Sequence, residues 1–150
     1  MMIQTIRDHE RVITQAIDCR APKRKVFETW TQPEWLKRWF FADVGMECRV
    51  AEVDLRVGGK YRLSMAMPGG PETVFDGSYQ AIAIPDALVY TWHGGEGEHV
   101  TLVTALFHDR DKGTRIDFTH GVFATVEAKE AHAKGWTACL KSLERLLEYD

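Results

Sequence analysis

The chain has 150 residues and a formal net charge of −3, with 45% hydrophobic and 27% charged residues. This length predicts one domain over residues 1–150, with enough chain to bury a sizeable core. The small negative charge argues against a nucleic-acid-binding protein, which usually presents a basic face. No apolar run approaches the roughly 18 to 20 residues that a membrane span needs.

The start of the chain and its cysteines predict a cytoplasmic location. Residues 1–10 carry polar and acidic side chains where a secretion signal needs an apolar stretch. Cys19, Cys48 and Cys139 are widely separated, and an odd count indicates reduced thiols. Each is interpreted as a small core residue, and the lack of a Cys-x-x-Cys pair argues against a zinc site. No metal and no other cofactor is predicted.

The first third of the chain predicts a strand followed by two short helices. Residues 11–19 alternate as a half-buried strand does. Pro22 suits the first turn of a helix, which is expected from Lys23 to Trp30. After a break at residues 31–34, a second short helix is predicted that carries Trp35, Leu36, Trp39 and Phe40.

The middle of the chain then follows a β pattern up to residue 120. Gly58-Gly59 is a hairpin signal between the first two of these strands, and Tyr61, Leu63, Met65 and Met67 should share a face. We expect a bend near Gly77 and a mobile loop at residues 94–98. Because tight turns join the strands, the sheet should be antiparallel and the fold class α+β. The predicted strands cover residues 50–57, 60–67, 73–84, 87–93, 99–108 and 115–120.

A long amphipathic helix is predicted from residue 125 or 126 to residue 149. The first half of its apolar stripe is small or polar, and the second half is large. Gly135 costs about 1 kcal/mol relative to Ala in a helix interior, which is reasonable where a ligand or neighbouring group must come close. One end of the helix could therefore seal the core while the other roofs a pocket; alternatively, Gly135 only permits close packing. The stripe comprises Ala128, Ala131, His132, Gly135, Trp136, Cys139, Leu140, Leu143, Leu146 and Leu147.

Five segments in the same order resemble one known family. Residues 21–40 contain Ala-Pro, a helix and Thr-x-Pro-Glu-x-Leu-x-x-Trp, and residues 54–62 resemble the family's central hairpin. Gly77-Ser78-Tyr79, Phe118-Thr119-His120 and His132-x-x-Gly-Trp-x-x-x-Leu-x-x-Leu complete the set. The chain resembles, over about residues 11–149, the homologues of the activator of heat-shock-protein-90 ATPase in the START-like (SRPBCC) superfamily.

This resemblance implies a helix-grip fold. A curved antiparallel sheet of about six or seven strands would wrap around the C-terminal helix, with a cavity between them. Superfamily members bind lipids, sterols, polyketides and other hydrophobic ligands, and some are cyclases or hydrolases. The eukaryotic chaperone activator also has a separate N-terminal domain that carries much of its partner contact, and this chain has no room for it. Fold alone does not define function.

The candidate site lies where the last strand faces the terminal helix. His120 and His132 come from these two elements, which should face each other, and either side chain could act as a general base in the cavity or instead cap a helix end or bond a backbone carbonyl. His93 and His99 flank the Gly-rich loop, but no helical His-x-x-x-His pair supports a metal site. The predicted ligand-binding residues are Trp39, Phe40, Met65, Trp92, Phe118, His120, His132, Gly135 and Trp136.

Three functions are compatible with the sequence. The first is binding of a small hydrophobic molecule in the cavity without chemistry. The second is an enzyme of the cyclase or hydrolase type that acts on such a molecule, with His120 or His132 as base. The third is a protein-interaction domain associated with a chaperone. Whether the protein is an enzyme stays open, and edge strands of the sheet could also pair two chains into a homodimer.

Overall fold

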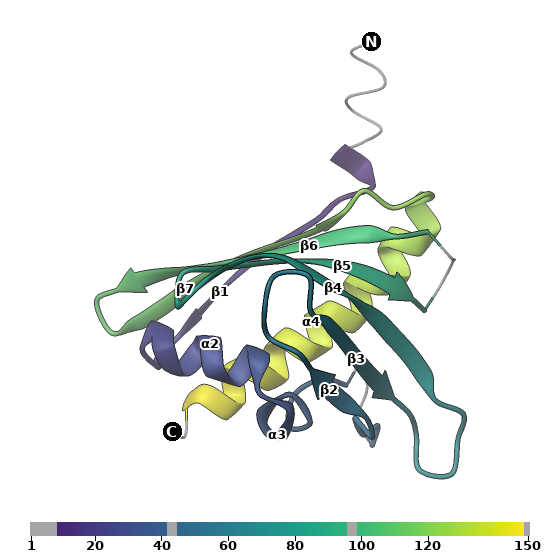
Figure 1. Cartoon of the computed structure of the whole chain (residues 1–150), viewed down its shortest axis with the longest axis horizontal. Helices are drawn as coiled ribbons and strands as arrows, with labels where there is room; N and C mark the ends of the chain where they lie inside the picture. The colour runs from purple at the N-terminus through teal and green to yellow at the C-terminus, as the bar shows by residue number, and fades with distance from the viewer. Residues whose placement is uncertain (1–8, 42–44, 96–98, 149–150) are drawn as a thin grey trace.

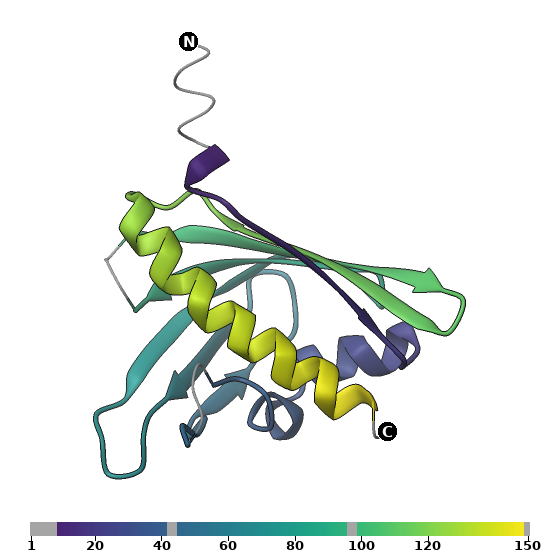
Figure 2. The same cartoon turned by 180° about the vertical axis from the view of Figure 1, so that it is seen from behind.

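The computed structural model describes residues 9–41, 45–95 and 99–148. In these ranges, a seven-stranded antiparallel sheet with the order β1-β7-β6-β5-β4-β3-β2 curves around one long helix, α4 (Val126–Glu148). Helix α4 crosses the concave face of the sheet diagonally, and the short helices α2 (Lys23–Thr31) and α3 (Pro33–Leu36) lie beside its C-terminal end (Figures 1 and 2). The strands are β1 (Ile13–Cys19), β2 (Ala51–Val53), β3 (Lys60–Met65), β4 (Thr73–Ala83), β5 (Ala87–Gly94), β6 (Thr101–Arg110) and β7 (Gly113–Gly121).

Alternation of side chains along the strands defines the inner face of the sheet. On β7, Ile116, Phe118 and His120 are buried, while Thr119 between them is exposed. On β6, Val103 and Ala105 are fully buried and pair directly with His120 and Phe118. The α+β class, the two short helices after the first strand and the long terminal helix are all confirmed.

Helix α4 covers this inner face with the predicted stripe. Thr125 caps its first turn, because the Thr125 hydroxyl accepts a hydrogen bond of 3.0 Å from the Ala128 N–H. Residues spaced three and four apart are then buried against the sheet, as an amphipathic helix requires. They are Trp136, Cys139, Leu140, Leu143 and Leu147.

Aromatic residues of α2 and α3 fill the space at one end of the helix. The Trp30 ring stacks on Trp136 at a centroid distance of 6.4 Å and lies 4.9 Å from the Trp39 ring. Both indole donors are satisfied, since Trp39 Nε1 donates to the Thr29 carbonyl at 2.9 Å and Trp30 Nε1 to the Tyr90 hydroxyl at 3.1 Å. This end of the molecule is therefore packed core.

Three local predictions about the sheet need correction. The strand expected at residues 50–57 covers only Ala51–Val53, because the chain then turns through backbone bonds from Arg56 N to Asp54 O and from Gly59 N to Arg56 O. The bend expected near Gly77 is instead a register shift between Tyr79 and Ala81.

The third correction is that Met67 does not share the face of Met65. Met67 is 47% exposed because β3 ends at Met65 and the chain turns back through a Gly70 N to Met67 O bond. The loop expected at residues 94–98 lies partly outside the described residues, which stop at 95 and resume at 99.

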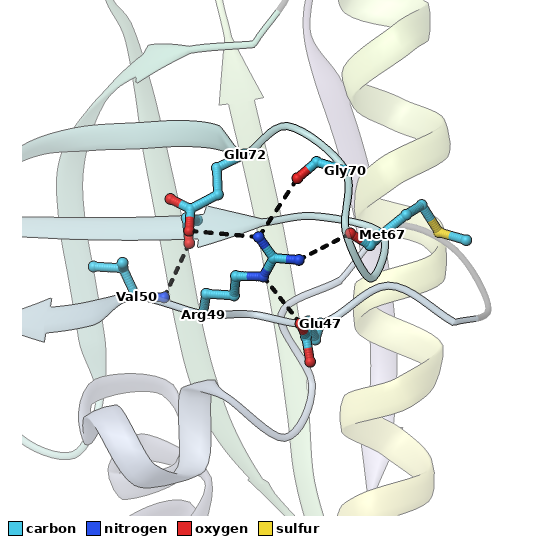
Figure 3. Close-up of polar contacts among 7 residues, drawn as sticks. Glu47, Arg49, Val50, Met67, Gly70 and Glu72 are labelled. Atoms are coloured by element: carbon cyan, nitrogen blue, oxygen red, sulfur yellow. Dashed lines mark hydrogen bonds and ion pairs between the residues drawn. The ribbon is translucent and has the colours of Figure 1, made fainter.

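Arg49 ties the segment before β2 to the β3–β4 hairpin (Figure 3). Its guanidinium donates to the carbonyls of Met67 at 3.0 Å and Gly70 at 3.4 Å, and to the Glu47 carboxylate at 2.9 Å. Beside it, the Val50 N–H donates to the Ser64 hydroxyl at 2.9 Å. These bonds tie the tip of the β3–β4 hairpin to the segment that precedes β2.

Replacing Arg49 should therefore destabilise the fold more than replacing an exposed arginine. We expect Arg49→Ala to lower the free energy of unfolding by about 1–3 kcal/mol, since it removes several charge-assisted hydrogen bonds. The control is Arg56→Ala, which removes a 74% exposed side chain paired with Asp54 and should cost about 0–1 kcal/mol. Urea denaturation of both variants measures the difference, and equal losses would contradict the role given to Arg49.

Candidate functional site

A pocket of about 330 Å³ lies between the first half of α4 and the ends of β3, β4 and β5. Its volume falls at the small end of the range of about 300–1,000 Å³ that is common for ligand sites. Thr73, Gly95 and Ala131 are exposed and form its rim, His132 and Gly135 are half-buried, and the other lining residues are buried. The lining residues are Phe40, Met65, Thr73, Phe75, Trp92, Gly95, Ala131, His132, Gly135, Trp136 and Cys139.

Aromatic side chains and small helical residues together line the pocket. Phe75 lies 4.7 Å from Trp92 between ring centroids, and Trp92 lies 5.2 Å from Trp136 of α4. The same helix also contributes Ala131 and Gly135, whose side chains are too small to fill the space. The pocket thus follows from the change of side-chain size along the apolar stripe of the helix.

The pocket includes six of the nine residues predicted from the sequence to bind a ligand. These are Phe40, Met65, Trp92, His132, Gly135 and Trp136, whereas Trp39, Phe118 and His120 do not line it. Among the residues that the prediction missed, Ala131 and Cys139 already belonged to the stripe of α4. Phe75 and Gly95 could not be assigned without the pairing of Phe75 with Gly94, which brings β4 beside the end of β5.

His120 is fully buried, and both of its ring nitrogens have partners. Trp136 Nε1 donates to Nδ1 at 3.0 Å, so Nε2 carries the ring proton and donates to the Thr101 hydroxyl at 2.6 Å. Burial, with a smaller contribution from nearby His132, lowers the pKa of His120 to about 2. His120 is therefore a neutral residue that joins β7 to α4, and the expectation that it reaches the pocket is not met.

His132 lies on α4, one turn before Trp136, and differs from His120 in its contacts. The two rings lie 5.6 Å apart between centroids and are nearly perpendicular, so the last strand and the terminal helix do face each other here, as expected. His132 Nδ1 lies 2.9 Å from the Ala128 carbonyl oxygen. Its Nε2 is buried and has no hydrogen-bond partner in the described part of the chain.

The remaining candidates for chemistry do not form a catalytic group with His132. The Cys139 thiol lines the pocket but donates to the Phe41 carbonyl at 3.3 Å, and burial raises its pKa to about 12. A thiol of this kind is a poor nucleophile because the thiolate is the reactive form. His93 pairs with Asp76 on the surface at 3.3 Å.

Two further findings concern the described residues alone. No three His, Cys, Asp or Glu side chains among them are arranged to hold a metal ion. None of the helices within residues 9–41, 45–95 and 99–148 is long and apolar enough to cross a membrane.

The arrangement of sheet, helix and intervening pocket defines a START-like helix-grip protein. The family model described as "Activator of Hsp90 ATPase homolog 1-like protein" matches residues 20–148. The chain belongs to this family. No curated protein matches its sequence.

Solved structures of similar proteins share the fold at low sequence identity. The protein CV1439 from Chromobacterium violaceum superposes with a TM-score of 0.84 at 24% identity, covering 93% of this chain and 99% of that one. An AHSA1-like protein from Aeromonas hydrophila gives a TM-score of 0.76 at 23% identity, covering 89% and 90%. At these identities the likeness establishes the fold, and the pocket chemistry has to be argued from this chain's own residues.

The depressed pKa of His120 predicts how stability depends on pH. Between its ordinary value of 6.5 and about 2, the unfolded chain binds a proton at this residue that the folded chain does not. Its contribution to stability is complete above pH 6.5 and decreases by up to about 1.4 kcal/mol per pH unit as the pH falls through that window.

The His120→Gln variant tests this dependence, since Gln can accept from Trp136 and donate to Thr101 but does not titrate. We expect the free energy of unfolding to fall less steeply between pH 6.5 and 5 in His120→Gln than in the unsubstituted protein, as measured by urea denaturation. The same change at exposed His99 controls for loss of an imidazole. An identical slope with and without His120 would contradict the assignment.

Proposed function

We propose that the protein binds a small, largely apolar molecule in the pocket between the sheet and the first half of α4. The observation that carries this proposal is the lining of a pocket of about 330 Å³: four aromatic side chains, Phe40, Phe75, Trp92 and Trp136, together with small residues of α4. Apolar walls with a few polar groups are typical of small-molecule sites. The exposed rim at Thr73, Gly95 and Ala131 provides a route for entry.

The composition of α4 supports binding over simple packing. Leu140, Leu143 and Leu147 fill the interface completely at the C-terminal end of the helix, with exposures of 0–1%. A core with no ligand to accommodate would gain about 1.5–3 kcal/mol for each further large side chain that it buried. At the pocket the same stripe instead carries Ala131 and Gly135.

An enzyme acting on such a molecule is the second candidate, and it now depends on His132 alone. His120 is excluded as a base because both of its nitrogens are engaged and its pKa is lowered to about 2. His132 Nε2 is free to accept a proton from a ligand. A chaperone-associated role rests only on the description of the family, and we rank it third.

Three further properties are part of the proposal. The chain forms one domain, since buried residues from Ile13 to Leu147 belong to a single core cluster. It resides in the cytoplasm, which is consistent with three free, buried cysteines. A homodimer through an edge strand, β1 or β2, is retained as a prediction.

Filling the pocket from its rim should abolish binding without affecting the fold. Ala131→Phe places a large side chain at an exposed lining position, and Lys134→Phe makes the same change on the exposed face of the same helix as a control. Native mass spectrometry of freshly purified protein, followed by extraction, should detect a small apolar molecule in the control but not in Ala131→Phe. Both variants should keep their stability within about 0.5 kcal/mol, as exposed substitutions do.

The matched pair also defines the result that would count against the proposal. A bound molecule retained by Ala131→Phe would place the ligand elsewhere. If neither variant nor the unsubstituted protein carries a molecule, titration with the aromatic probes described below decides whether the pocket binds at all.

A further inference from the structure

Two buried polar atoms in the described part of the chain have no hydrogen-bond partner: Trp92 Nε1 and His132 Nε2. Both residues line the pocket. Native proteins leave few buried polar atoms unpaired, and such an atom often marks a functional site or an absent partner. Other buried polar side chains nearby are satisfied, including His120, Thr101 and Trp136. A single absent hydrogen-bond partner would account for both unpaired atoms.

The contacts of His132 define what its free nitrogen offers. The Ala128 carbonyl can only accept a hydrogen bond, so His132 Nδ1, at 2.9 Å, carries a proton. In the neutral ring Nε2 then presents a lone pair and is an acceptor. Trp92 Nε1–H can only donate. The pocket thus holds one unused donor and one unused acceptor.

Gly95 packs closely against His132 Nε2 at the rim of the pocket. A Cβ atom placed on Gly95 would lie 3.2 Å from this nitrogen and 2.9 Å from the Phe75 ring. Gly95 also has a φ of +73°, which side chains rarely adopt, so a glycine is favoured here for two reasons. A side chain at position 95 would therefore press on both His132 Nε2 and Phe75, and glycine leaves this nitrogen uncovered from that position.

The two unpaired groups belong to neighbouring side chains of one pocket. The Trp92 and His132 rings lie 6.4 Å apart between centroids and are nearly perpendicular, with an interplanar angle of 76°. Trp92 is only 3% exposed, so water does not freely solvate its indole N–H. A polar group bound here would replace an unpaired state rather than a hydrated one.

We propose that the ligand of this pocket carries a neutral hydroxyl group, as a phenol or a small alcohol does, and that Trp92 and His132 recognise it. The hydroxyl oxygen accepts from Trp92 Nε1–H, and the hydroxyl proton is donated to His132 Nε2. A hydrocarbon satisfies neither atom, and an ether or ester oxygen satisfies only Trp92. The inference rests on the proposed function, because it concerns the same pocket.

The remainder of the ligand should be one or two rings. The lining offers the faces and edges of Phe40, Phe75 and Trp136, and aromatic groups gain from such contacts beyond their burial. A volume of about 330 Å³ suits a molecule of one or two rings better than a lipid chain or a sterol skeleton.

Three probes of nearly equal size test the inference on the unsubstituted protein. They are 2-naphthol, 2-methoxynaphthalene and 2-methylnaphthalene, whose substituents donate and accept, only accept, and do neither. Isothermal titration calorimetry at neutral pH should show 2-naphthol binding at least tenfold more tightly than 2-methylnaphthalene, because sites built to bond a hydroxyl reject analogues that lack it. The methoxy compound should fall between them.

Two substitutions test which residues recognise the hydroxyl group. His132→Phe should remove the advantage of 2-naphthol over 2-methoxynaphthalene and leave 2-methylnaphthalene binding unchanged within a few fold. Trp92→Phe should weaken the two oxygen-containing probes together. His108→Phe, at a half-exposed histidine of β6, and Trp35→Phe, at a half-buried tryptophan of α3 outside the pocket, are the matched controls. Circular dichroism of each variant establishes that it is folded.

The outcomes separate this inference from the proposed function. Equal affinity of all three probes would overturn the hydroxyl inference and leave apolar binding standing. Preference for 2-naphthol that survives in His132→Phe and Trp92→Phe would place the recognition elsewhere and would also overturn it. If none of the probes binds, both the hydroxyl inference and the proposed pocket function are wrong.

Discussion

The hydrogen bond between Trp136 and His120 is the contact on which the architecture depends. Trp136 is almost completely buried against Phe118, with ring centroids 4.5 Å apart, so its indole donor needs an internal partner. His120 on β7 is that partner, and its own Nε2–H donates a hydrogen bond to the Thr101 hydroxyl on β6. One short chain of bonds therefore fixes α4 against two adjacent central strands, in a region where an unpaired group would cost about 1–3 kcal/mol.

This contact divides the molecule into a packed half and an open half. On one side of Trp136 lie Trp30 and the leucines of α4, which pack closely and leave a gap of only about 20 Å³ beside Trp30 and Trp136. On the other side lie Trp92 and the small residues of the helix, which leave a pocket. Burial of three leucines is worth several times the roughly 1 kcal/mol that a helical glycine costs. The C-terminal half of α4 can therefore hold the helix on the sheet while the space beside its N-terminal half stays open.

Much of this arrangement follows from the sequence, because it depends on periodicity. Alternation along residues 115–120 and the spacing of large residues on α4 specify which faces are buried. Periodicity does not specify what lies in front of a buried residue. Phe118 and His120 point inward as predicted. However, Trp136 packs on Phe118 and Phe123 packs on His120, so both residues belong to the core and not to the pocket. Strand β2 is shorter than predicted for a related reason, since turns at Asp54 and Arg56 interrupt an otherwise regular alternation.

His120 and His132 show why the identity of a residue says less than its partners. The rings lie 5.6 Å apart, and from sequence either could have been the functional one. Both nitrogens of His120 are hydrogen-bonded, to Trp136 and Thr101, whereas only one nitrogen of His132 is, to the Ala128 carbonyl. The bond to Ala128 also fixes the tautomer, so the remaining nitrogen is an acceptor of defined direction. If the proposed hydroxyl ligand binds here, the site discriminates mainly through what other ligands leave unpaired, because the penalty for a buried unsatisfied group exceeds the net gain of an ordinary hydrogen bond. Such selectivity needs no charged side chain, and no Asp, Glu, Lys or Arg is among the lining residues in the described part of the chain.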